Sequence, residues 1–252
     1  MAAILLGMLL ASCSPGAEDL RGPQPTPPQH LLSETSGALS TTNSAGRSGS
    51  FLIPEHNAGQ ALPVLLGFHA TGGDGAGFIS AFSELAREQG FAIAAPDSRI
   101  SPTGEFTWEV GTEPNEVTPD YLHALNCLNE LEEEHELNIE LSAVLAAGYS
   151  GGASSAPYLA SSEGQFTAFA ILHGGVFPGG LGALRPRGWL STGEQDNLRS
   201  PDHMRGHLES LTNLGFTDLE LQIFAGGHGL GSTELTALVQ WWLRPDDSTA
   251  QR

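Results

Sequence analysis

Residues 144–152, Val-Leu-Ala-Ala-Gly-Tyr-Ser-Gly-Gly, constrain the fold of this chain more than any other stretch. The first four form an apolar run, which is typical of a strand covered on both faces of its sheet. The next five match G-x-S-x-G, in which a serine sits on a tight turn between a strand and a helix. Small residues at positions 148 and 152 let that strand and helix approach closely. The stretch therefore predicts a serine hydroxyl, that of Ser150, above the edge of a buried sheet.

The rest of the chain supports this interpretation, because apolar runs alternate with helical patterns from about residue 50 onward. Strand-like runs occupy residues 51–53, 62–68, 91–95, 143–147, 169–172, 189–190 and 219–224, and helical spacing occurs at 78–89, 120–137, 201–214 and 232–243. Such alternation predicts an α/β fold with a mostly parallel sheet covered by helices on both faces. The segment 174–188 is short and rich in Gly and Pro, so no lid of any size is expected there.

Length and charge narrow the class of protein. The 252 residues are enough for one large domain, and 40% hydrophobic with 15% charged residues is a globular composition. The formal net charge is −19, from 29 acidic and 10 basic residues. Nucleic acid and anionic membrane surfaces are therefore not expected as partners.

The N-terminus has the features of a targeting segment. Residues 1–12 are an apolar run too short to span a membrane, and Leu-Ala-Ser-Cys at 10–13 resembles the lipobox of bacterial lipoproteins, although no Lys or Arg precedes the run. We expect a signal peptide over 1–12, a lipidated Cys13 with a disordered tether over 13–49, and a catalytic domain over 50–245. This resemblance implies a bacterial cell-envelope location, lipid-anchored on the periplasmic or outer side, or secretion. An ordinary signal peptide or a misplaced start codon is the alternative.

A nucleophilic serine needs a base, and the base needs an orienting acid. His228 follows the predicted strand 219–224, and Asp196 follows the predicted strand at 189–190, so both lie at the sheet edge where Ser150 is expected. Glu194 and Asp202 are the rival acids. The order Ser150, Asp196, His228 is also the order of these residues in α/β hydrolases.

An oxyanion hole requires two backbone N–H groups directed at the developing charge. Gly151, directly after the serine, would supply one, and Thr71 in the glycine-rich loop 69–75 would supply the other, with Ala70 as its alternative. That loop lacks the G-K-[ST] ending of a phosphate-binding P-loop. His173 also ends a strand on this edge and is interpreted as a supporting residue, and Cys127 as a small packed thiol on a helix.

Several of these segments together resemble one group of α/β hydrolases, the polyhydroxybutyrate depolymerases, feruloyl esterases and acetylxylan esterases. The segments are 68–75, 120–122, 148–152, 166–172 and 227–228, and the resemblance covers about residues 50–243. It implies an α/β-hydrolase fold and a secreted serine esterase that needs no metal or organic cofactor and acts on polymer-linked or small acyl esters. The group usually has His-Gly in its first loop, whereas this chain has His69-Ala70.

The sequence thus predicts a serine carboxylic-ester hydrolase whose substrate is a polymer-linked or a small acyl ester. A serine peptidase of the same fold and a non-catalytic binding lipoprotein are the two alternatives. The sequence does not identify the acyl or alcohol part of the substrate, or the oligomeric state.

Overall fold

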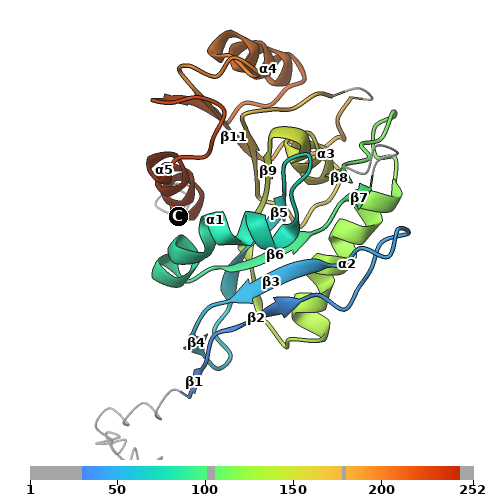
Figure 1. The fold of residues 1–252 in the computed structure, drawn as a ribbon, viewed down its shortest axis with the longest axis vertical. Helices are drawn as coiled ribbons and strands as arrows, with labels where there is room; N and C mark the ends of the chain where they lie inside the picture. The colour runs from blue at the N-terminus through green and yellow to red at the C-terminus, as the bar shows by residue number, and fades with distance from the viewer. Residues whose placement is uncertain (1–29, 101–105, 178–179, 245–252) are drawn as a thin grey trace, which may run out of the picture.

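The computed structural model describes residues 30–100, 106–177 and 180–244, which form a central eight-stranded sheet between two layers of helices (Figure 1). The strands of this sheet are β2 (Thr35–Ala38), β3 (Gly49–Ile53), β5 (Leu62–Phe68), β6 (Ala92–Pro96), β9 (Ile139–Tyr149), β10 (Ala168–Leu172), β11 (Arg187–Gly193) and β12 (Leu219–Phe224). The strand pairs β1 (Leu31–Leu32) with β4 (His56–Asn57), and β7 (Arg99–Ile100) with β8 (Phe106–Thr107), form two small ribbons. The helices are α1 (Gly75–Gln89), α2 (Pro119–Glu133), the 3₁₀ turn η1 (Ser150–Gly152), α3 (Ser155–Ala160), α4 (Pro201–Asn213) and α5 (Ser232–Leu243).

The order of strands across the sheet is β12-β11-β10-β9-β5-β6-β3-β2. Every pair from β12 to β6 is parallel, and β3 and β2 complete the sheet as antiparallel strands. The strand order reverses at β5. Strand β6 is added on one side of β5, whereas strands β9 to β12 are added on the other side. Ligands of open parallel sheets bind at such a switch point, beyond the carboxyl ends of the strands.

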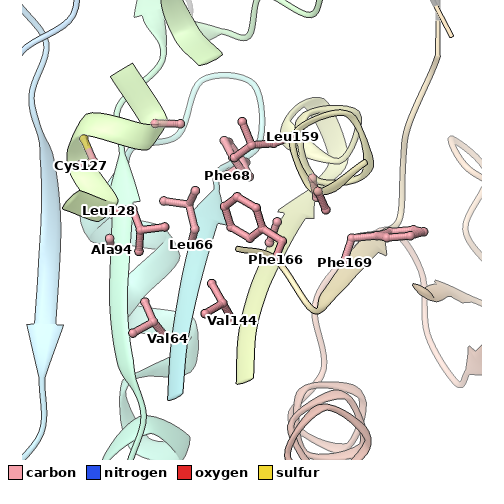
Figure 2. Close-up of a cluster of buried hydrophobic side chains, with 14 of the residues drawn as sticks. Val64, Leu66, Phe68, Ala94, Cys127, Leu128, Val144, Leu159, Phe166 and Phe169 are labelled. Carbon is pink, nitrogen blue, oxygen red and sulfur yellow. The ribbon is translucent and has the colours of Figure 1, made fainter. Parts of the chain in front are cut away.

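The two helical layers bury two separate apolar clusters. Helices α1 and α5 cover one face through Phe82 and Trp242, whereas α2, α3 and α4 cover the other. Figure 2 shows part of the second cluster, in which Leu128 of α2 and Leu159 of α3 lie over Leu66 of β5. The predicted mostly parallel sheet with helices on both faces is confirmed. Among the described residues, no helix has the length and apolar character needed to cross a membrane.

The folded domain begins earlier than the expected boundary at residue 50. β2 pairs with β3 along the sheet edge, and the Glu130 carboxylate accepts hydrogen bonds from Ser40 N at 2.5 Å and Thr41 N at 2.8 Å. The expectation of a disordered tether was therefore wrong for residues 30–49. Strand β2 is held by its backbone, since all four of its side chains are exposed, whereas Leu39, which follows it, is buried in the core. Cys13, the expected signal peptide and the rest of the expected tether lie outside the described residues.

Candidate active site

Ser150 begins η1 directly after β9, with a backbone φ of 50°. Few residues other than glycine adopt this left-handed conformation, and it projects the side chain away from the strand. The flanking glycines are required by close contacts, because a Cβ at Gly148 would lie 2.7 Å from Ala153 Cα and a Cβ at Gly152 would lie 2.6 Å from His69 O. The G-x-S-x-G stretch thus forms the predicted tight turn between a strand and a helix.

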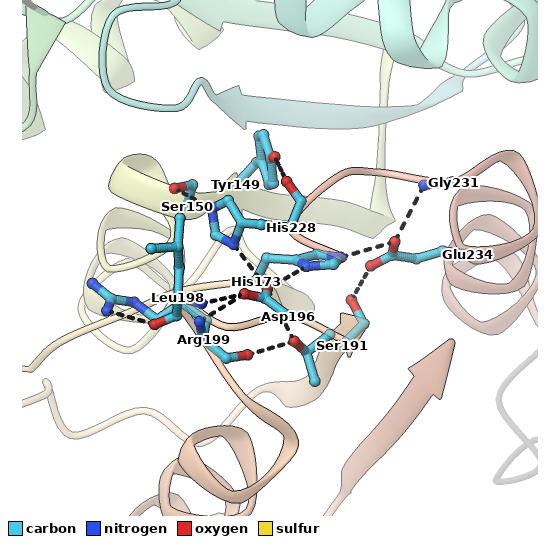
Figure 3. A network of polar contacts seen from close by, with 11 residues as sticks. Tyr149, Ser150, His173, Ser191, Asp196, Leu198, Arg199, His228, Gly231 and Glu234 are labelled. Carbon is cyan, nitrogen blue, oxygen red and sulfur yellow. Dashed lines mark hydrogen bonds and ion pairs between the residues drawn. The ribbon is translucent and has the colours of Figure 1, made fainter. Parts of the chain in front are cut away.

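Ser150, His228 and Asp196 lie in one chain of hydrogen bonds (Figure 3). Ser150 Oγ is 2.9 Å from His228 Nε2, and His228 Nδ1 is 2.8 Å from Asp196 Oδ2. A proton on Nδ1 is therefore donated to the carboxylate, which leaves the Nε2 lone pair facing the serine hydroxyl. This is the arrangement in which a histidine can accept a proton from a serine.

The rival acids lie elsewhere. Asp202 is on the first turn of α4, where it forms an exposed ion pair with Arg205 at 2.6 Å. Glu194 is exposed, and its backbone N–H donates to Phe224 O at 2.7 Å. Asp196 is thus the acid that the fold places beside His228.

Asp196 is buried but well supplied with hydrogen-bond donors. Its Oδ1 accepts from the backbone N–H of Leu198 at 2.9 Å and of Arg199 at 2.7 Å, while Thr192 Oγ1 lies 3.3 Å from Oδ2. Burial alone would raise the pKa of this carboxyl, but the donors from Arg199, His173, His228 and Leu198 outweigh it and hold the pKa well below its usual range. Asp196 is therefore a carboxylate at neutral pH.

A second histidine contacts the same carboxylate oxygen. His173, the residue after β10, is 1% exposed, and its Nδ1 lies 2.8 Å from Asp196 Oδ2. Its Nε2 lies 3.1 Å from Oε2 of Glu234 on the first turn of α5. Ser191 donates to the other oxygen of Glu234 at 2.5 Å. Burial lowers the pKa of His173, but the hydrogen bonds and charges of Glu234 and Asp196 have the larger combined effect and raise it.

The two predicted oxyanion donors are neighbours. A Cβ at Gly151 would lie 2.9 Å from Thr71 N, so these two backbone segments pack directly together. Among the described residues, the N–H groups of Gly151 and Thr71 form no backbone hydrogen bond outside the helices and strands. Thr71 fits the role better than Ala70, because the three atoms nearest to a Cβ built on Gly151 all belong to Thr71.

Hydrogen bonds of the buried residues His69 and Trp108 stabilise the loop that carries Thr71. His69 accepts from Ser98 N through Nε2 at 3.0 Å and donates from Nδ1 to Ala70 O at 2.7 Å. Burial lowers the pKa of His69, so its ring is neutral and suits one donor and one acceptor role. Trp108 is buried, and its Nε1 donates to His69 O at 2.8 Å, so this side chain supports the loop.

Ser150 is partly exposed at the end of β9. The described residues of segment 174–188 contain no helix, in agreement with the expected absence of a lid. Beside the serine turn lies a hollow of about 280 Å³, whose lining includes Ala70, Phe78, Ala81, Tyr149 and Leu230. Its mostly apolar lining suits a hydrocarbon group of a substrate.

Within the described residues, one group of side chains has the composition of a metal site, namely His173, Asp196 and His228, whose nearest ligand atoms lie within 4.8 Å of one another. We assign these contacts to hydrogen bonds, because both histidines lie 2.8 Å from a single carboxylate oxygen and each ring uses its second nitrogen for another polar partner.

Cys127, on α2, is fully buried, and burial raises the pKa of its thiol. It is the packed thiol that the sequence predicted.

Three parts of this arrangement were not predicted from the sequence. Glu234 was not singled out, and neither was the hydrogen bond of 2.8 Å from Tyr149 Oη to His228 O. The role of Trp108 behind the loop is the third. An aromatic residue at the variable position of G-x-S-x-G was the one available signal for Tyr149, whereas the contacts of Glu234 depend on how α5 packs against the sheet.

Comparisons with known proteins identify the fold. No protein-family model matches this chain, and no curated protein matches it in sequence. Among solved structures, the chain is similar to a carboxylesterase from Mesorhizobium loti, with a TM-score of 0.58 and 21% identity over 83% of this chain and 99% of that one. It is also similar to TT1662 from Thermus thermophilus, with a TM-score of 0.62 and 18% identity over 85% of this chain and 100% of that one.

A Pyrococcus horikoshii acylaminoacyl peptidase is similar to 79% of this chain over 38% of its own length, with a TM-score of 0.60 and 14% identity. Together with the strand order and the serine turn at the end of β9, these likenesses show that the chain has the α/β-hydrolase fold.

Proposed function

We propose that this protein is a serine esterase that hydrolyses carboxylic esters through Ser150, His228 and Asp196. The observation that carries the proposal is the unbroken chain of hydrogen bonds, 2.9 Å from Ser150 Oγ to His228 Nε2 and 2.8 Å from His228 Nδ1 to Asp196 Oδ2. It lies at the switch point of the sheet, with Ser150 and His228 partly exposed and Asp196 buried. A non-catalytic binding protein has no need of all three side chains in this relation.

The chemistry is acyl transfer in two steps. Ser150 Oγ attacks the ester carbonyl while its proton passes to His228 Nε2, and Asp196 stabilises the imidazolium. The backbone N–H groups of Gly151 and Thr71 receive the oxyanion of the tetrahedral intermediate. Collapse of the intermediate breaks the bond to the alcohol, which takes the proton from His228. Water then attacks the acyl-serine with the same histidine as base, and releases the acid.

The proposed substrates are esters with an accessible acyl group, either small or attached to a polymer. The described residues provide no lid over Ser150, and the apolar hollow beside Tyr149 has room for a short acyl chain. These features, with the residues that resemble polyhydroxybutyrate depolymerases, feruloyl esterases and acetylxylan esterases, support polymer-linked esters. A lipid anchor on Cys13 would hold the enzyme at the bacterial cell envelope, where such polymers are met.

The activity is tested with p-nitrophenyl esters of increasing acyl length, beside an acetylated xylan, a feruloylated oligosaccharide and an aminoacyl p-nitroanilide. We expect turnover of the esters to exceed that of the anilide. Faster turnover of the anilide would favour the peptidase alternative, and no turnover of any of them by folded protein would favour a binding protein. The anchor is tested separately, since radiolabelled palmitate should enter the wild-type chain and not the Cys13→Ala variant in a bacterial host.

A further inference from the structure

The carboxylate of Asp196 serves two histidines at one oxygen atom. His228 Nδ1 and His173 Nδ1 each lie 2.8 Å from Oδ2, although only His228 contacts the serine. The two rings are perpendicular, with centroids 5.6 Å apart and an angle of 88° between their planes. Figure 3 shows His173 between Asp196 and Glu234, with its ring pointing toward Glu234.

The surroundings of His173 specify its charge. Both ring nitrogens face carboxylate oxygens, Asp196 Oδ2 at 2.8 Å and Glu234 Oε2 at 3.1 Å, so both have to donate. A histidine that donates from both nitrogens is an imidazolium. Glu234 is 1% exposed and Asp196 is 2% exposed, and two buried carboxylates without a cation between them would be costly.

Among the described residues, His173 is the one cationic side chain that pairs with Glu234, and His228 is the other group that pairs with Asp196. Tyr149 of β9 packs edge-on against His173, with centroids 5.9 Å apart, and His228 comes from the loop after β12. Burial, together with the charges of Asp196 and Glu234, raises the pKa of Tyr149, so its hydroxyl is neutral. The direction of the shift at His173, toward a higher pKa, agrees with the charge that the geometry specifies.

We propose that His173 and Glu234 form a positioning pair for the catalytic acid, in which the His173 imidazolium, held by Glu234, fixes Asp196 and sets the net charge that His228 meets during the reaction. The effect of this pair on kinetics rests on the proposed function, because it requires that the protein hydrolyses esters. The charge of His173 does not depend on that activity. Neither residue touches the substrate, so both act through Asp196.

The charge balance explains why both residues are needed. Asp196, His173 and Glu234 together carry one net negative charge, the same as an aspartate alone. Loss of the Glu234 charge would leave a neutral group, which stabilises the His228 imidazolium less. Loss of the His173 charge would leave two negative charges, which stabilise it more. The two losses therefore have opposite effects on the pH at which His228 becomes a base.

The test is the pH profile of kcat/KM for ester hydrolysis in Glu234→Gln, His173→Gln and the double variant. The acid limb should move to lower pH in Glu234→Gln and to higher pH in His173→Gln. For His173, whose ring centroid lies 5.6 Å from that of His228, the shift should be about one pH unit or more at an effective dielectric constant of about 20. In the double variant, which loses one charge of each sign, the limb should return close to that of the wild type. Glu130→Gln is the matched control, because Glu130 is also buried but lies on α2 and binds the backbone of Ser40 and Thr41.

A purely structural role would lower stability or the active fraction and leave the limb in place. The proposal would be overturned if the acid limb of the pH profile did not move in either single variant, or if it moved in the same direction in both.

A measurement on the wild-type protein covers the case in which a variant does not fold. In a ¹H–¹⁵N NMR spectrum near neutral pH, His173 should show protons on both ring nitrogens, and a neutral His173 would overturn the proposal. This NMR result is independent of ester turnover, so failure of the pair and failure of the esterase assignment are distinguishable.

Discussion

The ends of β9 and β10 lie side by side and share a backbone conformation, but their side chains enter different surroundings. Tyr149 pairs with Leu172 in the sheet, and the next residues, Ser150 and His173, have φ values of 50° and 51°. Ser150 is half-buried and meets one partner, His228, at the open edge. His173 is 1% exposed and lies between two carboxylates.

The difference shows how one strained conformation serves two purposes. A non-glycine residue in this region costs about 1–3 kcal/mol, and surrounding contacts have to offset it. At Ser150 the contacts of the neighbouring glycines hold the turn, while the side chain itself contributes little packing. At His173 the side chain offsets the cost through its own ionic hydrogen bonds. Activity should therefore depend chiefly on the first strand end, and stability chiefly on the second.

The largest effect is expected from Ser150→Ala. Loss of the nucleophile should lower kcat/KM for an activated ester by about 10⁴-fold or more. The midpoint of thermal unfolding should change little, because the serine side chain has one hydrogen-bond partner at the open edge. Ser83→Ala, on the exposed side of α1, is the control for loss of a hydroxyl. Turnover retained by the Ser150 variant would contradict the assignment of the nucleophile.

The substitution Gly174→Ala should disturb both strand ends, because Gly174 follows His173 and packs against Ser150. A Cβ at this position would lie 2.9 Å from Ser150 Cα and 2.9 Å from Ala153 Cβ, so the serine turn has to shift. We expect kcat to fall by about 10- to 100-fold, as is typical for displacement of a reacting group by a fraction of an ångström or more. Gly164→Ala is the matched control, because a Cβ there meets nothing within 4 Å. Equal activity of the two variants would show that the strand ends tolerate separation.

The contribution of His173 to stability should depend on pH. Its pKa is raised in the folded state, so the folded protein binds the extra proton and the stabilisation is complete below the unfolded value of about 6.5. The stabilisation is lost as the pH rises toward the folded pKa, with a slope of up to about 1.4 kcal/mol per pH unit. Urea unfolding of the wild type and His173→Gln should therefore show a difference in free energy that shrinks from pH 6.5 upward. A difference that grows with pH would contradict a charged His173.

The smallest effect is expected from Tyr149→Phe. This variant keeps the ring beside His173 and His228 but loses the hydrogen bond of 2.8 Å to His228 O. A net loss of about 1 kcal/mol in positioning corresponds to a fall in kcat/KM of about fivefold. Tyr121→Phe, which loses a hydroxyl contact to Glu163, is the control and should leave turnover unchanged. A fall of several orders of magnitude would instead give the Tyr149 hydroxyl a part in the chemistry.

The sequence was most informative where local mechanics decide the structure. The glycines around Ser150 are required by contacts within a few residues, so a short pattern was enough to locate the turn. The positions of Asp196 and His228 followed from strand alternation, because the carboxyl ends of parallel strands share one edge.

The sequence was least informative where distant segments meet. Glu234 follows His173 by 61 positions, and nothing in its own helix marks it as buried or paired. Strand β2 has no buried side chain, so its pairing with β3 leaves no apolar alternation to detect. In both cases the tertiary packing, rather than local propensity, determines the outcome.

The central claim is that Ser150 is an activated nucleophile. The most direct test is incubation of the purified full-length chain with a fluorophosphonate, followed by mapping of the adduct by mass spectrometry. We expect a single adduct on Ser150, formed rapidly by the wild type and at least about 10³-fold more slowly by His228→Ala, which lacks the base. No adduct on folded wild-type protein, or labelling that is unaffected by loss of His228, would contradict it.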